Sequence, residues 1–139
     1  MSISDPTFFD VDCLNRDVKM LVGRVTIGGS GVPTPADPVR DLGLGWTLEG
    51  GSGSSGFTQG QYKLTLDKTY TGLVHASFSC FDISGGGVPV AFEVISEDVD
   101  GNKEIRFDSY LASAPAVEDD VPSNSDITFC LYLLDGDVS

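Results

Sequence analysis

The stretch QYKLTLDKTYTGLVHASFSC, residues 61–80, decides the fold. Apolar and polar side chains alternate through its first six residues, and they alternate again from residue 72 onward. A period of two residues is that of a β-strand with one buried face and one face in water. The apolar positions are Tyr62, Leu64 and Leu66 in the first run, and Val74, Ala76, Phe78 and Cys80 in the second.

The same alternation recurs on both sides of this stretch. It is present in VKMLVGRVTI (18–27), LGLGWTLE (42–49), VPVAFEVISE (88–97), KEIRFDSYL (103–111) and DITFCLYLLDGD (126–137). No segment keeps a helical period for more than two turns, and glycines and prolines separate the runs. The sequence therefore predicts an all-β fold, either an antiparallel β-sandwich or a jelly-roll-like barrel of about seven to eight strands.

The chain of 139 residues has the length of one domain. We expect a single β-sandwich domain over residues 18–139, preceded by an extended N-terminal arm over residues 1–17. In the arm, Phe8 and Phe9 lie among aspartates without a sustained period. In an isolated domain these rings would fold back over their own core, whereas in an oligomer they would be interface residues that anchor a subunit contact.

Three segments rich in glycine, proline or serine are expected to be loops. They are residues 28–38, the sequence GGSGSSG at 50–56, which is typical of a flexible tether within a natural loop, and residues 113–126, which we expect to cross from one sheet to the other. Trp46 shares a strand face with Leu44 and Leu48, so we expect its ring in the core.

The formal net charge of −13 leaves no basic stripe on the chain. Nucleic acid and anionic membrane surfaces both attract clustered Lys and Arg, so neither is an expected partner. The first residues show neither the basic flank nor the apolar run of a targeting segment, and no apolar run has the length of a membrane span.

The three cysteines, Cys13, Cys80 and Cys130, lack the CxxC or Cys/His spacing of a zinc site. Free cysteines are usually buried, so we expect reduced, buried thiols. The alternatives are a disulfide between Cys80 and Cys130 and an intermolecular one.

One acidic stretch could be a metal site. In SEDVDGNKEIRF, residues 96–107, oxygen-bearing side chains occupy alternate positions around a glycine, as in a calcium loop. The stretch lacks the glycine at the sixth position and the glutamate at the twelfth that a helix-loop-helix calcium site needs. We therefore expect no metal site, with a weak calcium contact as the alternative. The side chains concerned are Asp98, Asp100, Asn102 and Glu104.

The same stretch predicts a β-hairpin. Asp100-Gly101 suits a two-residue turn, because both positions take positive φ. Counting back from this turn predicts the cross-strand pairs Val99–Asn102, Asp98–Lys103, Ser96–Ile105, Val94–Phe107 and Val90–Leu111.

Catalytic patterns are weak. His75 is the only histidine, and it lies on the polar side of a predicted strand. Ser77 and Ser79 share its face, but alternate residues of a strand are always neighbours, so this proximity indicates no catalytic group. The glycine-rich segments lack the lysine of a phosphate-binding loop, and no carboxylate pair stands in an apolar setting. We expect no enzymatic activity, no catalytic residue and no cofactor.

Three segments together resemble a group of small virion structural proteins of tailed bacteriophages. They are GQYKLTLDKTYTGLVHASFS (60–79), FEVISEDVDGNKEIRF (92–107) and DVPSNSDITFCLYLLD (120–135). In that group a GxYxVxLD strand, a turn leading into a second strand, a hairpin and a closing strand follow in this order. The resemblance covers residues 57–135 and rests on a β-pattern with a few fixed turn residues.

The resemblance implies a head decoration or cement protein that binds the assembled head and stabilises it as a homo-oligomer, with a trimer favoured. Its partners would be the major capsid protein or neighbouring virion proteins, and its location the virion, assembled in the host bacterial cytoplasm. The alternative is a tail-associated carbohydrate- or receptor-binding β-sandwich module. Such a module would have exposed aromatic residues in one concave patch. The candidates for these residues are Tyr70, Tyr110 and Tyr132. Placement on the head or on the tail stays open.

Overall fold

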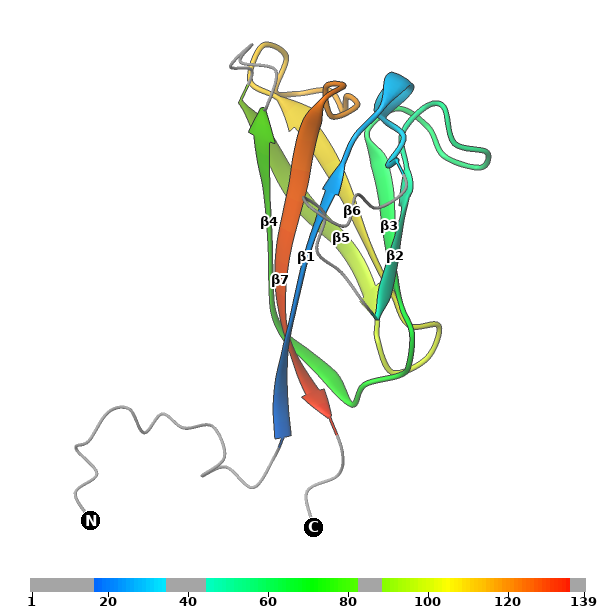
Figure 1. Ribbon diagram of the computed structural model, residues 1–139, viewed down its shortest axis with the longest axis vertical. Helices are drawn as coiled ribbons and strands as arrows, with labels where there is room; N and C mark the ends of the chain where they lie inside the picture. Colours follow the sequence, from blue (N-terminus) through cyan, green and yellow to red (C-terminus); the bar gives the residue numbers. More distant parts are fainter. Residues whose placement is uncertain (1–16, 35–44, 83–88, 136–139) are drawn as a thin grey trace, which may run out of the picture.

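The protein is almost entirely β-structure in the computed structural model, which describes residues 17–34, 45–82 and 89–135 (Figure 1). Within these ranges no helix is long and apolar enough to cross a membrane. One short 3-10 turn, η3, covers Gly29–Gly31. The strands are β1 (Asp17–Thr26), β2 (Trp46–Gly50), β3 (Gln61–Leu66), β4 (Gly72–Asp82), β5 (Val90–Asp98), β6 (Glu104–Leu111) and β7 (Ser125–Asp135).

The strands form two antiparallel sheets that pack face to face. One sheet has the strand order β1-β7-β4, and the other has the order β2-β3-β6-β5 (Figure 1). Only β2 to β3 and β5 to β6 are consecutive neighbours within a sheet, so every other connection crosses the sandwich. The segment between β6 and β7 is one of these crossings, as predicted. The all-β sandwich is thus confirmed, with seven strands in the described part of the chain.

Apolar side chains from the two inner faces form the core. Phe107 of β6 stacks on Phe78 of β4, with ring centroids 4.1 Å apart, and on Tyr62 of β3 at 5.5 Å. Fully burying a side chain of this kind stabilises the fold by about 1.5–3 kcal/mol. The alternation predicted for β3 and β7 is confirmed by the buried set Tyr62, Leu64, Leu66, Ile127, Phe129, Leu131 and Leu133.

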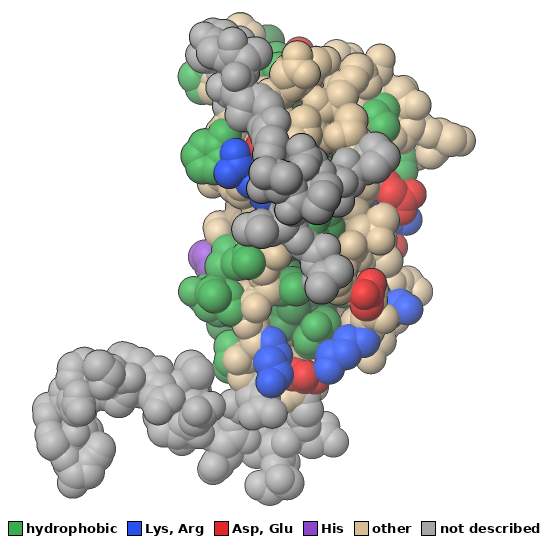
Figure 2. Space-filling view, in the orientation of Figure 1, with side chains coloured by type: hydrophobic (Ala, Val, Ile, Leu, Met, Phe, Trp, Pro, Cys, Tyr) green, Lys and Arg blue, Asp and Glu red, His purple; other side chains and the backbone are tan. Residues whose placement is uncertain are grey.

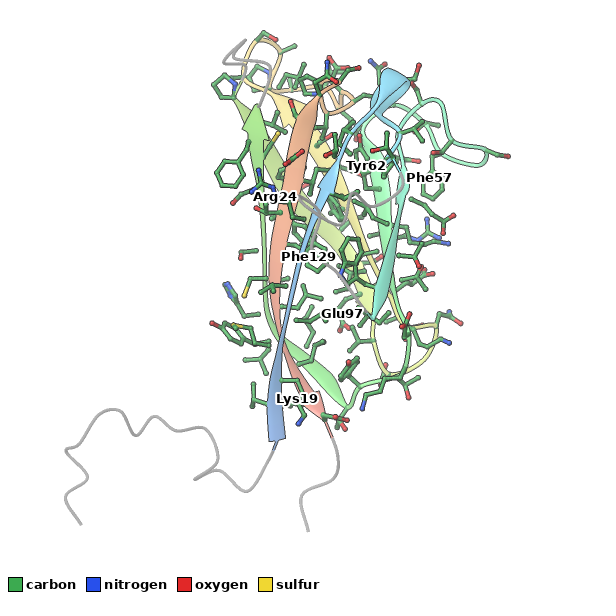
Figure 3. All side chains as sticks on the ribbon, in the orientation of Figure 1. Lys19, Arg24, Phe57, Tyr62, Glu97 and Phe129 are labelled. Carbon is green, nitrogen blue, oxygen red and sulfur yellow. The ribbon has the colours of Figure 1, made fainter. Side chains whose placement is uncertain are left out.

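Trp46 and Phe129 close the core against β1. Their rings meet edge to face with centroids 4.9 Å apart, and Phe129 lies between the two sheets (Figure 3). Gly23 of β1 makes room for both, because a Cβ there would lie 2.4 Å from the Phe129 ring and 2.6 Å from the Trp46 ring. Trp46 therefore packs on the core, as predicted.

Tyr62 joins two loops at one end of the sandwich (Figure 3). Its hydroxyl donates to the carbonyl oxygen of Gly31 at 2.8 Å and accepts from the backbone N–H of Val121 at 3.2 Å. Burial raises the pKa of the Tyr62 phenol far above its usual value, because a phenolate there would lose its hydration. The hydroxyl thus stays protonated and keeps both hydrogen bonds.

Asp120 holds the glycine-rich loop between β2 and β3. Its carboxylate accepts from the backbone N–H of Ser52 at 3.0 Å and from that of Gly60 at 2.8 Å. Gly51 is buried with φ 84, and a Cβ there would lie 2.4 Å from the Gly31 carbonyl oxygen. The segment 50–56 is therefore an ordered loop, and not the flexible tether that its composition indicates.

The hairpin between β5 and β6 departs from the predicted register near its turn. The pairs Val90–Leu111 and Val94–Phe107 are confirmed. After Val94 the register shifts by one residue at a β-bulge, so the predicted pairs closer to the turn are wrong. The observed pairs there are Ser96–Arg106, Glu97–Ile105 and Asp98–Glu104.

A longer turn causes this shift. The backbone N–H of Lys103 donates to the carbonyl oxygen of Asp98 at 2.8 Å, and Lys103 takes a φ of 67. Val99, which a two-residue turn would place in the strand, is instead 1% exposed, and its carbonyl accepts from the N–H of Tyr70 at 2.9 Å. Burial of Val99 thus outweighs the local preference of Asp-Gly for a two-residue turn.

A second irregularity lies in β4. The pairing of β4 with β7 shifts between Leu73 and His75, which leaves Val74 without a place in the alternation. Val74 is 58% exposed, so the prediction that it shares the inner face with Ala76 and Phe78 is wrong. A bulge adds one unpaired residue to a strand, which a strict period of two does not reveal.

Candidate functional site

The outer face of the three-stranded sheet is nearly free of charge. Because β1 and β4 both pair with β7, the outward residues of the three strands form cross-strand rows. In a chain with a net charge of −13, a sheet face with one cation and one anion is unusual. We call it the neutral face, and its rows are Met20–Tyr132–His75, Val22–Cys130–Ser77, Arg24–Thr128–Ser79 and Thr26–Asp126–Phe81.

One end of the neutral face exposes apolar side chains. Met20 is 60% exposed, Val22 42% and Tyr132 39%, and Val74 lies beside them in the bulge of β4. The ring of His75 lies 5.9 Å from that of Tyr132. Figure 2 shows hydrophobic side chains gathered next to the only histidine, at the left of the view. A contiguous exposed apolar set of this kind is typical of a protein-binding surface.

At the other end of the neutral face the two charges cancel. Nε of Arg24 donates to Oδ2 of Asp126 at 2.6 Å, and Oγ1 of Thr26 donates to Oδ1 of the same carboxylate at 2.8 Å. The guanidinium of Arg24 also lies over the Phe81 ring, 5.4 Å from its centroid. Asp126 is fully buried beneath this arrangement. The pair therefore presents no net charge to an approaching partner.

The outer face of the four-stranded sheet has the opposite character. It carries two ion pairs, Lys63 with Glu49 and Arg106 with Glu104, at 3.9 and 3.0 Å. Desolvation raises the pKa of the nearby Asp108 carboxyl, and the carboxylates of Glu118 and Glu93 raise it further. Covering this face would desolvate many charges, which is costly. The outward charged residues are Glu49, Lys63, Glu93, Asp98, Glu104, Arg106 and Asp108.

The side chains considered as catalytic groups lie on the neutral face, whereas those considered as metal ligands lie at the hairpin between β5 and β6. His75 packs on Tyr132, with Ser77 and Ser79 following it along the outer face, as predicted. Asp98 uses Oδ2 to accept from the backbone N–H of Asn102 at 2.9 Å, which caps the hairpin turn. Across residues 17–34, 45–82 and 89–135, no three His, Cys, Asp or Glu side chains converge as a metal ion requires.

Cys80 and Cys130 lie on opposite faces of the three-stranded sheet. Cys80 pairs with Ile127 on the inner face, whereas Cys130 pairs with Ser77 on the neutral face. Side chains on opposite faces point apart, so the alternative disulfide between them is excluded. Both are half-buried. Cys13 lies outside the described residues.

The candidate tyrosines share no patch. Tyr70 packs against the core before β4, Tyr110 is on the outer face of the four-stranded sheet, and Tyr132 is on the neutral face. A separate hollow of about 550 Å³ lies where β5 begins and β6 ends, and Tyr110 and Glu93 are among its lining residues. Most of its lining is apolar: Pro89, Val90, Ala91, Phe92, Leu111, Ala112 and Pro115.

The predicted interface residues Phe8 and Phe9 lie outside the described residues. The chain that carries them enters the sandwich at Asp17, where β1 begins. Met20, three residues further on, is the first residue of the exposed apolar end. The predicted arm therefore joins the domain beside this end of the neutral face.

The neutral face was not predicted from the sequence, although a signal for it is present. Met20 and Val22 alternate with inward-facing residues of β1, so they occupy positions where a half-buried strand usually has polar side chains. Tyr132 holds the equivalent position in β7.

Comparison with known proteins found no similar protein: no family model, no curated protein and no solved structure matches the chain.

Proposed function

We propose that this chain is a non-enzymatic virion structural protein of a tailed bacteriophage, a head decoration or cement protein that docks on the assembled head and stabilises it. The resemblance of residues 57–135 to small virion proteins motivates the proposal. The observation that carries it is the neutral face, which combines exposed apolar residues with internally paired charges. A docking protein needs such a surface and needs no reacting group.

The energetics of the neutral face favour docking. Its strands are held in backbone ladders, so binding would order few additional groups. Apolar area removed from water contributes about 25 cal/mol per Å², and the exposed side chains at one end supply that area. The acidic surface elsewhere keeps free copies soluble. The partner in this proposal is the major capsid protein or a neighbouring virion protein.

The proposal includes a homo-oligomer, with a trimer favoured. It is supported by the resemblance of residues 57–135 to small virion proteins. Phe8 and Phe9 at a subunit contact stay a prediction. Light scattering gives the solution mass of the chain and so tests whether it forms an oligomer.

Co-sedimentation tests the docking surface. Heads would be purified from the phage that carries the gene, after deletion of that gene, and mixed with the purified chain. Met20→Glu places a carboxylate on the apolar end, where docking would bury it without a partner. We expect this variant to bind the heads about tenfold more weakly or worse, a loss of about 1.4 kcal/mol.

Ile95→Glu is the matched control. Ile95 is 52% exposed on β5, in the other sheet, so the same substitution there should leave binding unchanged. Equal binding by both variants and the original chain would show that the neutral face is not the docking surface. A chain that never sediments with the heads would contradict the decoration role itself.

A second candidate function is the tail-associated carbohydrate- or receptor-binding module. The observation that favours it is the hollow beside β5 and β6. There the Tyr110 ring would stack on a sugar ring, and the Glu93 carboxylate would accept a hydrogen bond from a sugar hydroxyl. Titration with a panel of glycans, followed by chemical shifts, tests it. Binding that Tyr110→Ala abolishes would support this candidate against the decoration role.

A further inference from the structure

We propose that the free edge of β5, over residues 90–94, accepts an extended segment of a partner protein as an added strand. The segment would alternate apolar side chains with lysine or arginine. The site lies in the four-stranded sheet and not on the neutral face, so it goes beyond the proposed function. A chain docked on a head through its neutral face would keep this edge open to a second partner.

The backbone of β5 has hydrogen-bonding groups that point away from its sheet. β5 is the last strand of the order β2-β3-β6-β5 in the described part of the chain. The N–H of Ala112 donates to the carbonyl oxygen of Pro89 at 3.0 Å, and hydrogen-bonded pairs alternate along an antiparallel ladder. The next hydrogen-bonded pairs toward β6 are Ala91–Tyr110 and Glu93–Asp108. The residues between them therefore direct their N–H and C=O groups to the free edge: Val90, Phe92 and Val94.

The inward side chains at this edge are incompletely covered. Val94 pairs with the buried Phe107 and faces the core, and yet it is 40% exposed. Phe92 also faces inward and is half-buried, although its ring lies near that of Phe78, with centroids 6.3 Å apart. The three-stranded sheet thus leaves this side of the sandwich partly open. An added strand would cover Phe92 and Val94 with its own inward side chains, and apolar residues suit those positions.

The hollow of about 550 Å³ adjoins the same residues. The consecutive residues 89–93 line it together with Tyr110. Ala91, which pairs with Tyr110, has only a methyl side chain, so a longer side chain can pass over it toward the Tyr110 ring. Neighbouring strands are about 4.8 Å apart, which places an added strand about 10 Å from β6. A lysine or arginine side chain spans most of this distance and brings its cation near the ring.

Carboxylates without a cation surround Tyr110. Glu93 lies directly opposite Asp108, and Glu118 forms a β-bridge with Tyr110. None of the ion pairs among the described residues involves these three carboxylates. Desolvation raises the pKa of the Tyr110 phenol, and the three carboxylates raise it further. Like charges directly opposite each other destabilise a sheet, so a cation from a partner would relieve their repulsion.

The same charges disfavour a second copy of this chain at the edge. Pairing of residues 90–94 with the same residues of a second copy would bring two Glu93 side chains and their acidic neighbours together without a cation. The β-bulge after Val94 also limits the edge to these five residues, because a bulge twists a strand away from further pairing. Strand addition through backbone hydrogen bonds, with alternate side chains giving specificity, fits a short basic segment instead.

NMR spectroscopy of the full chain with synthetic peptides tests this site. The first peptide has seven residues, alternating lysine and valine, with both ends blocked. At nine-tenths saturation it should slow amide hydrogen exchange at Val90, Phe92 and Val94 about tenfold, because those N–H groups gain acceptors. The amides of Ala91 and Glu93, already bonded to β6, should change little. The same peptide with N-methylated amides keeps its side chains and lacks the donors, so it should bind at least tenfold more weakly.

Charge reversal tests the choice of partner. Glu93→Lys should weaken binding of the lysine peptide about tenfold and allow a peptide of alternating glutamate and valine to bind. Glu49→Lys is the matched control, since it makes the same change of charge on β2, at the opposite edge of the same sheet. It should leave the affinity within about twofold. Equal binding of the lysine and glutamate peptides by the original chain would overturn the proposal, as would full binding of the methylated peptide.

Other occupants of the edge give different results. Val90, Phe92 and Val94 amides that are protected in the free chain would overturn the proposal. Protection that grows with protein concentration would assign the edge to a second copy, and protection independent of concentration would assign it to the chain itself. No binding of the lysine peptide at about 1 mM would also overturn it. None of these measurements uses a phage particle, so failure here is distinct from failure of the docking proposal.

Discussion

Removing the hydroxyl of Tyr62 should destabilise the protein more than its size suggests. Tyr62→Phe keeps the ring stacked on Phe107 and deletes a single oxygen atom. That oxygen is the partner of two backbone groups, the carbonyl of Gly31 and the N–H of Val121. Tyr62 and Val121 are each 1% exposed and Gly31 is buried, so water cannot easily replace the lost partner.

The expected magnitude follows from these two groups. A buried donor or acceptor left without a partner costs about 1–3 kcal/mol. With two groups affected and some relaxation of the loops, we expect a loss of about 2–4 kcal/mol in the free energy of unfolding, out of a total of about 5–15 kcal/mol for a domain. At about 3–4 °C per kcal/mol for a chain of this length, the melting temperature should fall by about 6–16 °C.

Urea denaturation followed by circular dichroism measures this loss. The slope of the unfolding free energy against urea should not change, because both proteins bury nearly the same surface. Tyr132→Phe is the matched control: its ring is 39% exposed on the neutral face, so the same deletion should change stability by less than about 0.5 kcal/mol. A Tyr62→Phe variant as stable as the Tyr132→Phe variant would refute the assignment of Tyr62 as the tie between the loops.

Four further predictions concern the core, the loops, pH and metal. Gly23→Ala should cost about 1–3 kcal/mol and shift the fluorescence of Trp46, because the added methyl meets the rings of Trp46 and Phe129. Asp120→Ala should lower the free energy of unfolding by about 1–2 kcal/mol, since two backbone N–H groups lose their acceptor. It should also expose the loop at residues 50–60 to cleavage by thermolysin. Above pH 10 the original chain should lose about 1.4 kcal/mol per pH unit more than Tyr62→Phe, because the raised pKa keeps the folded phenol protonated while the unfolded chain ionises. Addition of EDTA should leave the melting temperature unchanged, because the hairpin turn is held by protein hydrogen bonds.

Each of these has a control within the same chain. Gly29→Ala adds a methyl where no atom lies within 4 Å, so it should be neutral, and an equal loss at both glycines would contradict the packing argument for Gly23. Asp100→Ala removes an exposed carboxylate from the hairpin turn and should leave proteolysis of the loop unchanged. Parallel pH curves for the original chain and Tyr62→Phe would show that the phenol does not resist ionisation. A melting temperature that falls with EDTA would point to a bound metal.

Local patterns predicted most of the strands and most of the core. The alternation in β3 and β7 correctly predicted which side chains are buried, because a period of two is set by the strand itself. It failed at Val74 and beyond Val94, where a bulge adds one residue and shifts the alternation. Bulges depend on what the partner strand and the core require, so the residues of one strand do not specify them.

The loops and the surface depend on contacts between distant residues. The glycine-rich loop is ordered by Asp120, which lies 68 residues after Ser52. The charge balance of the neutral face rests on Arg24 and Asp126, which are 102 residues apart. Their proximity follows from the register between β1 and β7, which no local pattern in either strand fixes. For this reason the strands could be predicted from the sequence, whereas the candidate site could not.

Cryo-electron microscopy of heads saturated with the purified chain would test the central claim most directly. We predict added density for the sandwich on the shell, with the three-stranded sheet turned toward the capsid protein and β5 facing solvent. Density that meets the shell through the four-stranded sheet, or heads without added density at saturating protein, would contradict the claim that the neutral face docks on the virion.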